Sequence, residues 1–184
     1  MMTRPLGADV LGQVLEAPLT YDEVGETYAE LLPPGYAHLR QSAVIGSGRE
    51  CFERAAEAVM RWEAQRGAGT EMVATDSPLR EGTTVVQLLH IGPLRFLAPC
   101  RVVAVLEQPD RRGFAYGTLT GHPATGEERF DVRIDAAGTV VAEVTAFSRP
   151  ARWYTRIGSP VSRLVQRAMV RRYLRALSVP AGAA

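Results

Sequence analysis

Apolar and polar residues alternate with a period of two from Thr70 to Phe147, the pattern of half-buried β-strands. Turn signals such as Gly92-Pro93 and Ala137-Gly138 divide this stretch. It is predicted to contain strands at 70–75, 83–91, 98–107, 112–121, 128–135 and 139–148, and an earlier run at 36–45 is a candidate for one more. Because connections this short cannot form parallel crossovers, we expect an antiparallel meander.

Helical spacing of apolar residues appears before this stretch, between residues 47 and 67. Ser47 and Glu50 have the spacing of a capping box, in which the glutamate side chain reaches back to the cap amide. Gly67 is a natural C-cap. The pattern predicts one continuous helix between these signals.

A second long helix is predicted at 159–177, with Ser159 as its N-cap and Pro160 at the first helical position. Its apolar stripe comprises Val161, Leu164, Val165, Ala168 and Met169, and is extended by Leu174 and Leu177. Weaker patterns predict short helices at 7–17 and 19–32.

The order of elements indicates how they pack. A sheet with one apolar face must be covered, and the terminal helix supplies that cover. We therefore predict an α+β fold in which a curved antiparallel sheet of six to seven strands packs on a long C-terminal helix. This is the helix-grip plan of START and Bet v 1-like proteins, an analogy that rests on element order. Such a sheet tends to leave a cavity beside the helix.

The length of 184 residues suits one domain, 1–184. Within it we expect an N-terminal extension at 1–18, a core at 19–177 and a flexible tail at 178–184. No apolar run approaches the roughly 18–20 residues that span a bilayer. The first residues lack the order of a signal peptide, so a cytoplasmic location is expected.

The net charge of +1 conceals an asymmetry, because residues 144–184 contain eight arginines and no acidic residue. A basic tail can bind nucleic acid or an anionic membrane, here through Arg163, Arg167, Arg171, Arg172 and Arg175. Alternatively it folds back on the acidic N-terminal segment. We favour the second interpretation, and expect no nucleic-acid partner, because no aromatic residues are interleaved for base stacking.

The least ordinary segment of the chain is 113–123. Tyr116 and Thr118 place a phenol and a hydroxyl on one face of a predicted strand, whereas Gly117 and its neighbours leave the other face open to close approach. The following turn brings His122 near two carboxylates, Glu127 and Glu128. A histidine beside a carboxylate can act as a general base, and it can equally cap a hairpin by bonding the turn backbone.

A second candidate segment ends the last strand. Arg149 and Trp153 could lie at a cavity mouth and bind an anionic head group, or form a packed corner with the arginine solvated. The three histidines and two cysteines have no metal-binding spacing, so no metal site and no cofactor are predicted. Cys51 and Cys100 are expected to be packed small hydrophobes.

These segments together resemble the signature of one bacterial and plant family, domain-of-unknown-function family nineteen-ninety. The matching blocks are Leu19-Thr20-Tyr21, Pro33-Pro34-Gly35-Tyr36, Pro99-Cys100-Arg101-Val102-Val103, Gly113-Phe114-Ala115-Tyr116-Gly117-Thr118-Leu119, Gly121-His122-Pro123, Gly126-Glu127-Glu128, Ala146-Phe147-Ser148-Arg149-Pro150 and Pro160-Val161-Ser162-Arg163-Leu164-Val165-Gln166. They extend from about residue 19 to 177. Thr120 departs from the pattern, which more often has proline there. The resemblance implies a distant relation to helix-grip proteins and transfers no activity, substrate or catalytic residue.

Three functions follow as hypotheses. The leading one is binding of a small hydrophobic or lipid-like ligand between the sheet and helix 159–177, with contacts from Tyr116, Thr118, His122, Arg149 and Trp153. The second is an enzyme of cyclase, hydratase or isomerase type, with His122 as acid/base and Glu127 or Glu128 orienting it. The third is the nucleic-acid or membrane adaptor that uses the basic tail.

Overall fold

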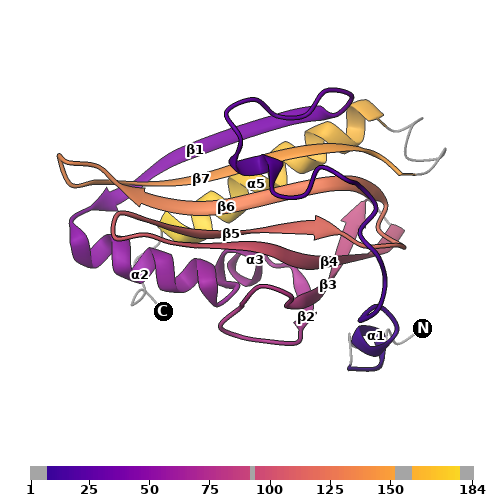
Figure 1. Ribbon diagram of the computed structural model, residues 1–184. Coiled ribbons are helices and arrows are strands. Elements are labelled where there is room, and N and C mark those ends of the chain that lie inside the picture. The colour runs from indigo at the N-terminus through magenta and orange to yellow at the C-terminus, as the bar shows by residue number, and fades with distance from the viewer. Residues whose placement is uncertain (1–7, 92–93, 152–158, 179–184) are drawn as a thin grey trace.

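The computed structural model of the chain describes residues 8–91, 94–151 and 159–178. Seven strands form one sheet in the order β1-β7-β6-β5-β4-β3-β2, and each neighbouring pair is antiparallel (Figure 1). The strands are β1 (Ala37–Ser47), β2 (Glu71–Ala74), β3 (Thr84–Ile91), β4 (Leu94–Glu107), β5 (Arg111–Thr118), β6 (Ala124–Ile134) and β7 (Thr139–Pro150). The predicted meander is confirmed, and the run at 36–45 is the first strand, paired with the last.

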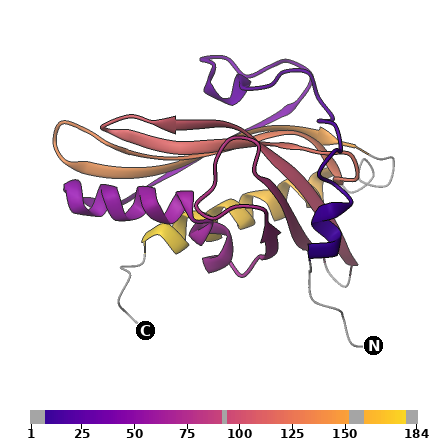
Figure 2. The same ribbon diagram turned by 60° about the horizontal axis from the view of Figure 1, so that its bottom comes forward.

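Helices lie on one side of this sheet. They are α2 (Arg49–Met60), α3 (Glu63–Gly67) and the long α5 (Ser159–Ser178), whereas α1 (Ala8–Gly12) and the 3-10 turn η1 (Glu26–Tyr28) belong to the N-terminal segment. Figure 2 shows α2 and α5 beneath the sheet and η1 with its flanking chain above it, whereas α1 lies at one end, near β3 and β2. The α+β arrangement predicted from the element order is therefore confirmed.

The main core lies between the sheet and these helices. Apolar side chains at alternate positions of the strands point to the helical side, and pack on Phe52, Val59 and Trp62 of the α2–α3 region and on Val170 and Leu174 of α5. Their burial supplies most of the stabilisation, at about 25 cal/mol for each Å² of apolar surface removed from water.

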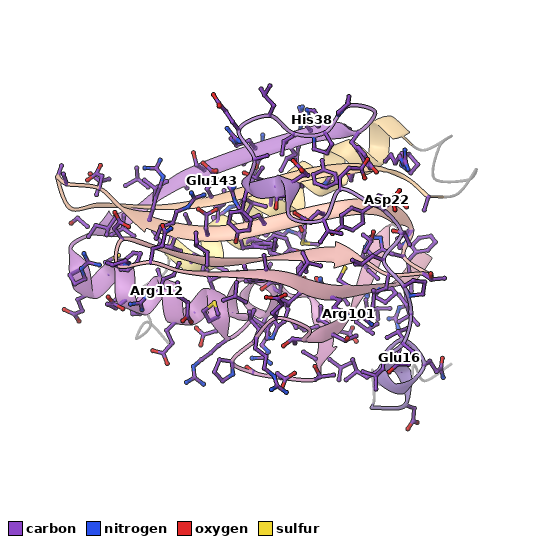
Figure 3. The ribbon with its side chains drawn as sticks, in the orientation of Figure 1. Glu16, Asp22, His38, Arg101, Arg112 and Glu143 are labelled. Atoms are coloured by element: carbon purple, nitrogen blue, oxygen red, sulfur yellow. The ribbon has the colours of Figure 1, made fainter. Side chains whose placement is uncertain are left out.

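The opposite face of the sheet is covered by residues 18–36, which we call the strap. Thr20 donates its backbone N–H to the Thr118 carbonyl at 3.1 Å, and Thr120 donates in return to Pro18 at 3.1 Å. Gly117 permits this close approach, because a Cβ atom there would lie 2.1 Å from the Tyr21 hydroxyl oxygen. In Figure 3, Asp22 of the strap and Glu143 of β7 lie on this same side.

A buried ionic cluster holds the sheet beneath the strap. The Arg129 guanidinium donates to Asp131 at 2.9 Å and to Glu143 at 2.7 Å, and it also bonds the backbone carbonyl of Thr27 in the strap. Its carbon centre lies 5.1 Å from the ring centroid of Tyr28. Charges this well paired tolerate burial, because each keeps several hydrogen bonds.

The helix predicted at 47–67 is in fact two helices. Trp62 interrupts it with a left-handed backbone (φ 66°), because the buried indole packs against Phe114 and donates to the Asp76 carbonyl at 3.1 Å. The capping-box prediction is also wrong. Ser47 is still in β1, paired with Thr139, so the cap falls on Gly48 and no side-chain hydrogen bond closes it.

The helix predicted at 19–32 is reduced to η1. Backbone N–H groups of Gly25 and Thr27, which a helix over 19–32 would bond to the carbonyls of Tyr21 and Glu23, instead donate to the Glu127 carboxylate on β6. A long-range carboxylate therefore replaces local helical bonding in the strap.

The prediction that the basic tail folds on the acidic N-terminal segment is wrong for the terminal helix. The strap and α5 lie on opposite faces of the sheet (Figure 2). Arg167, Arg171 and Arg175 are exposed on α5. Among the tail arginines that the structure describes, Arg149 at the end of β7 lies near a strap acid, Glu23, whose pKa is lowered mainly by the hydrogen bond from Tyr36 and to a smaller extent by the Arg149 charge.

Candidate functional site

A cavity of about 490 Å³ lies between the sheet and α5. Strands β3 to β7, the start of β1 and the His122 turn form its walls, and α5 closes it. Its apolar lining includes Ala37, Leu89, Ala98, Ala146, Met169 and Val170. The helix-grip arrangement thus leaves a space here that its side chains do not fill.

Tyr116 and Glu128 form the central polar contact of this cavity. They are direct partners across the β5–β6 ladder, and the Tyr116 hydroxyl donates to the Glu128 carboxylate at 2.8 Å. Gln87 on β3 donates its amide nitrogen to the same hydroxyl at 3.3 Å. All three residues line the cavity, so two hydrogen bonds join three strands along its wall.

Burial raises the pKa of Glu128 from 4.5 to about 7, and the hydrogen bond from Tyr116 opposes that shift. Its other titratable neighbours, Cys100 and Tyr173, are acids whose own pKa values rise through burial and through the charge of Glu128. No ion pair joins Glu128 to an arginine within the described parts of the chain. This carboxyl can therefore exchange a proton near neutral pH.

His122 lies at the turn between β5 and β6 and lines the same cavity. Its Nδ1 atom is 2.9 Å from both the backbone nitrogen and the carbonyl oxygen of Ala124. Burial lowers its pKa from 6.5 to about 4, so the ring is neutral at physiological pH. The turn backbone thus uses one ring nitrogen, as in the hairpin-capping interpretation, while the residue still borders the cavity.

Glu127 and Glu128 are consecutive in a strand, so their side chains point to opposite faces. The Glu127 carboxylate is bound by the strap: it accepts from the Tyr21 hydroxyl at 2.8 Å and from Gly25 and Thr27. No described hydrogen bond links either glutamate to His122. The structure therefore brings Glu128 and His122 to one cavity, and although Glu127 also borders that cavity, its carboxylate is bound by the strap.

Thr118 also borders the cavity, but its hydroxyl is already bonded, 2.6 Å from the Thr20 hydroxyl and 3.0 Å from the Gly126 nitrogen, which donates to it. Arg149 is exposed at the rim, with its guanidinium carbon 4.6 Å from the ring centroid of Tyr36. Trp153, the remaining predicted contact, lies outside the described residues.

Sequence reasoning missed Gln87 and Tyr173. Both had a signal. Gln87 is a polar residue that alternates with Val85 and Leu89 on the strand face that points inward. Tyr173 lies four residues after Met169, on the apolar stripe of the terminal helix. A symmetrical hairpin around His122 would also have placed Tyr116 opposite Glu128.

In the described ranges, no group of three or more His, Cys, Asp or Glu side chains is arranged to hold a metal ion. Over the same ranges, no helix combines the length and apolar character needed to cross a membrane. The polar groups on the cavity wall include Tyr116, Glu128, Gln87 and His122.

Comparison with known proteins places the chain in a family. The family model described as "Domain of unknown function (DUF1990)" matches residues 20–176. The chain belongs to this family. Its relatives include a UPF0548 protein of Deinococcus radiodurans, 37% identical over 91% of this chain and 89% of that protein. Another, from Arabidopsis thaliana, is 31% identical over 78% of this chain and 72% of that one.

Solved structures with the same architecture confirm the helix-grip fold. A START superfamily protein from Mycobacterium smegmatis matches with a TM-score of 0.57 at 11% identity, over 78% of this chain and 95% of that one. Ginseng major latex-like protein 151 from Panax ginseng matches with a TM-score of 0.55 at 16% identity, over 79% and 99%. Truncated norcoclaurine synthase from Thalictrum flavum matches with a TM-score of 0.54 at 13% identity, over 78% and 91%. At these identities the likeness concerns the fold alone.

Proposed function

We propose that this protein binds a small, largely apolar molecule in the cavity between the sheet and α5. The observation that carries the proposal is a space of about 490 Å³ whose wall is mostly apolar surface and carries several convergent polar groups. Binding sites for small molecules typically measure about 300–1,000 Å³ and have this mixed lining. The START superfamily neighbour is compatible with such a role.

The register of the sheet indicates the dimensions of the ligand. Glu128 pairs with Ala146, and Arg149 pairs with Thr125, three residues along β6. At about 3.3 Å per strand residue, the rim arginine is about 10 Å from the Glu128 position. A molecule of one or two fused rings, or a short acyl chain, spans that distance.

A fluorescent apolar probe, N-phenyl-1-naphthylamine, tests this proposal. We expect saturable binding to the wild-type protein, weakened at least tenfold by Ala37→Phe, which adds a ring at the cavity wall. Val44→Phe adds the same type of ring on β1 at a position that is 67% exposed, and is expected to bind like the wild type. Absence of saturable binding, or equal binding by all three proteins, would refute the proposal.

A second candidate is acid–base catalysis in the same cavity, and the raised pKa of Glu128 favours it. A general acid or base works best when its pKa lies near the working pH. Glu128, at about 7, meets this condition, whereas neutral His122, at about 4, does not. Deuterium incorporation into the methyl group of 2-acetylnaphthalene in D2O, present with wild-type protein and lost in Glu128→Gln, would support this function. Equal rates in both proteins would exclude it for this ketone.

A further inference from the structure

The polar wall of the cavity contains hydrogen-bond acceptors that no described residue satisfies. Tyr116 donates to one oxygen of Glu128, and the other oxygen, Oε1, receives no hydrogen bond within the described ranges. Glu128 is partly exposed and borders the cavity, so this oxygen faces space that a ligand can enter.

Gln87 provides a second, independent acceptor on the neighbouring wall. Its side chain is 3% exposed and borders the cavity, and its Oε1 atom has no hydrogen-bond partner among the residues that the structure describes. A buried acceptor without a donor is unfavourable, because it has lost its hydrogen bonds to water.

The directions of these two hydrogen bonds determine which side-chain atom of Gln87 remains without a partner. An ionised Glu128 can only accept, so Tyr116 must use its single proton toward that carboxylate. The Tyr116 oxygen then has only lone pairs to offer Gln87, which therefore turns its NH2 group toward it. The Gln87 carbonyl oxygen necessarily points elsewhere. Two acceptors, one on Gln87 and one on Glu128, thus flank the same phenol.

We propose that Glu128 and Gln87, held by Tyr116, form a recognition subsite for a hydrogen-bond donor, a hydroxyl or an amine, on an otherwise apolar ligand. The inference rests on the proposed function and names the chemistry of the ligand. A carboxylate at this position would face the Glu128 carboxyl and the unpaired Gln87 oxygen, so acids are disfavoured. A pure hydrocarbon would leave both acceptors unpaired.

Four compounds that share one ring system test the subsite: 1-naphthalenemethanol, 1-naphthalenemethylamine, 1-methylnaphthalene and 1-naphthoate. Each is titrated against wild-type protein carrying N-phenyl-1-naphthylamine, at pH 8. We expect the alcohol and the amine to bind at least tenfold more tightly than methylnaphthalene, and naphthoate to bind most weakly. Comparing the affinities of the alcohol and the amine shows whether the subsite prefers a hydroxyl or an amine as its hydrogen-bond donor.

Two variants separate the acceptors. Gln87→Met keeps side-chain length and removes the unpaired oxygen, so the preference for the alcohol over methylnaphthalene is expected to fall to threefold or less. Glu128→Gln removes the negative charge that attracts a protonated amine, so the amine is expected to lose at least tenfold in affinity while the affinity of the alcohol changes less than threefold. Gln41→Leu is the control, because Gln41 borders a separate groove beside Leu174 of α5. It should retain every preference of the wild type.

The outcomes are distinguishable. If none of the four compounds displaces the probe and the probe itself does not bind, the proposed function fails. If all four bind with equal affinity, or naphthoate binds most tightly, ligand binding stands and the donor subsite is refuted. Preferences that persist unchanged in both Gln87→Met and Glu128→Gln also refute it.

Discussion

Glu128 is expected to reduce the stability of the protein at neutral and basic pH, and Glu128→Gln to relieve that cost. A carboxyl pKa raised by burial from 4.5 to about 7 means that the folded protein keeps a proton that the unfolded chain releases between these values. The free energy of unfolding therefore falls as pH rises through this window. At about 1.4 kcal/mol per pKa unit, the full loss is at most about 3 kcal/mol.

Glutamine has the shape of glutamate and still accepts from Tyr116, but it does not ionise. The variant should therefore equal the wild type near pH 4.5, and exceed its free energy of unfolding by up to about 3 kcal/mol at pH 8. His122 also titrates in part of this range, but it does so in both proteins, so its effect cancels in the difference.

Urea unfolding of both proteins at intervals from pH 4.5 to 8 measures this difference. Gln41→Leu, which changes no titratable side chain, is the control and should show a difference from the wild type that does not change with pH. A pH-independent difference for Glu128→Gln, or a less stable variant at pH 8, would contradict the raised pKa of Glu128.

Further predictions concern the strap, the turn and the ligand. Glu127→Ala should destabilise the protein by about 3 kcal/mol or more, because it leaves the strap donors unpaired, and limited proteolysis should then cut within 18–36. Gly117→Val should have a similar effect by displacing Tyr21, and normal protease resistance would contradict this. Burial lowers the pKa of His122, so this residue contributes up to about 3 kcal/mol to the free energy of unfolding above pH 6.5, and the contribution is lost as pH falls toward 4. Urea unfolding of His122→Asn should not show this loss. Affinity for 1-naphthalenemethylamine should rise about tenfold between pH 6 and 8 as Glu128 ionises, whereas affinity for the alcohol should change less than threefold.

The fold was predictable because it depends on local signals. Period-two alternation located six of the strands, and the short turns between them allowed only antiparallel neighbours, whereas the seventh strand was a mixed run at 36–45. The terminal helix was found from its apolar stripe and observed at Ser159–Ser178. These features are encoded within each segment and need no information about its partners.

The errors arose where distant residues override local preference. The strap contains a helical pattern, yet Glu127, about 100 residues away, binds its backbone amides and holds an irregular conformation. Trp62 lies in a helical pattern as well, but burial of its indole against Phe114 interrupts the helix. Such long-range competition is not visible in a window of neighbouring residues.

The candidate site was predicted in part. Tyr116, His122 and Glu128 were chosen from an unusual segment, and the structure brings all three to one cavity. β6 begins at Ala124, earlier than the predicted strand at 128–135. Glu127 and Glu128 therefore lie inside the strand, on opposite faces of the sheet, which the sequence pattern did not indicate. Gln87 was missed because its role requires knowing that β3 lies two strands from β5.

A crystal structure of the wild-type protein with 1-naphthalenemethanol tests the central claim most directly. We expect the naphthalene ring between the sheet and α5, in contact with the apolar lining of the cavity, and its hydroxyl within hydrogen-bond distance of Glu128 or Gln87. A ligand bound elsewhere on the protein, or a cavity closed by its own side chains in crystals soaked at saturating concentration, would contradict it.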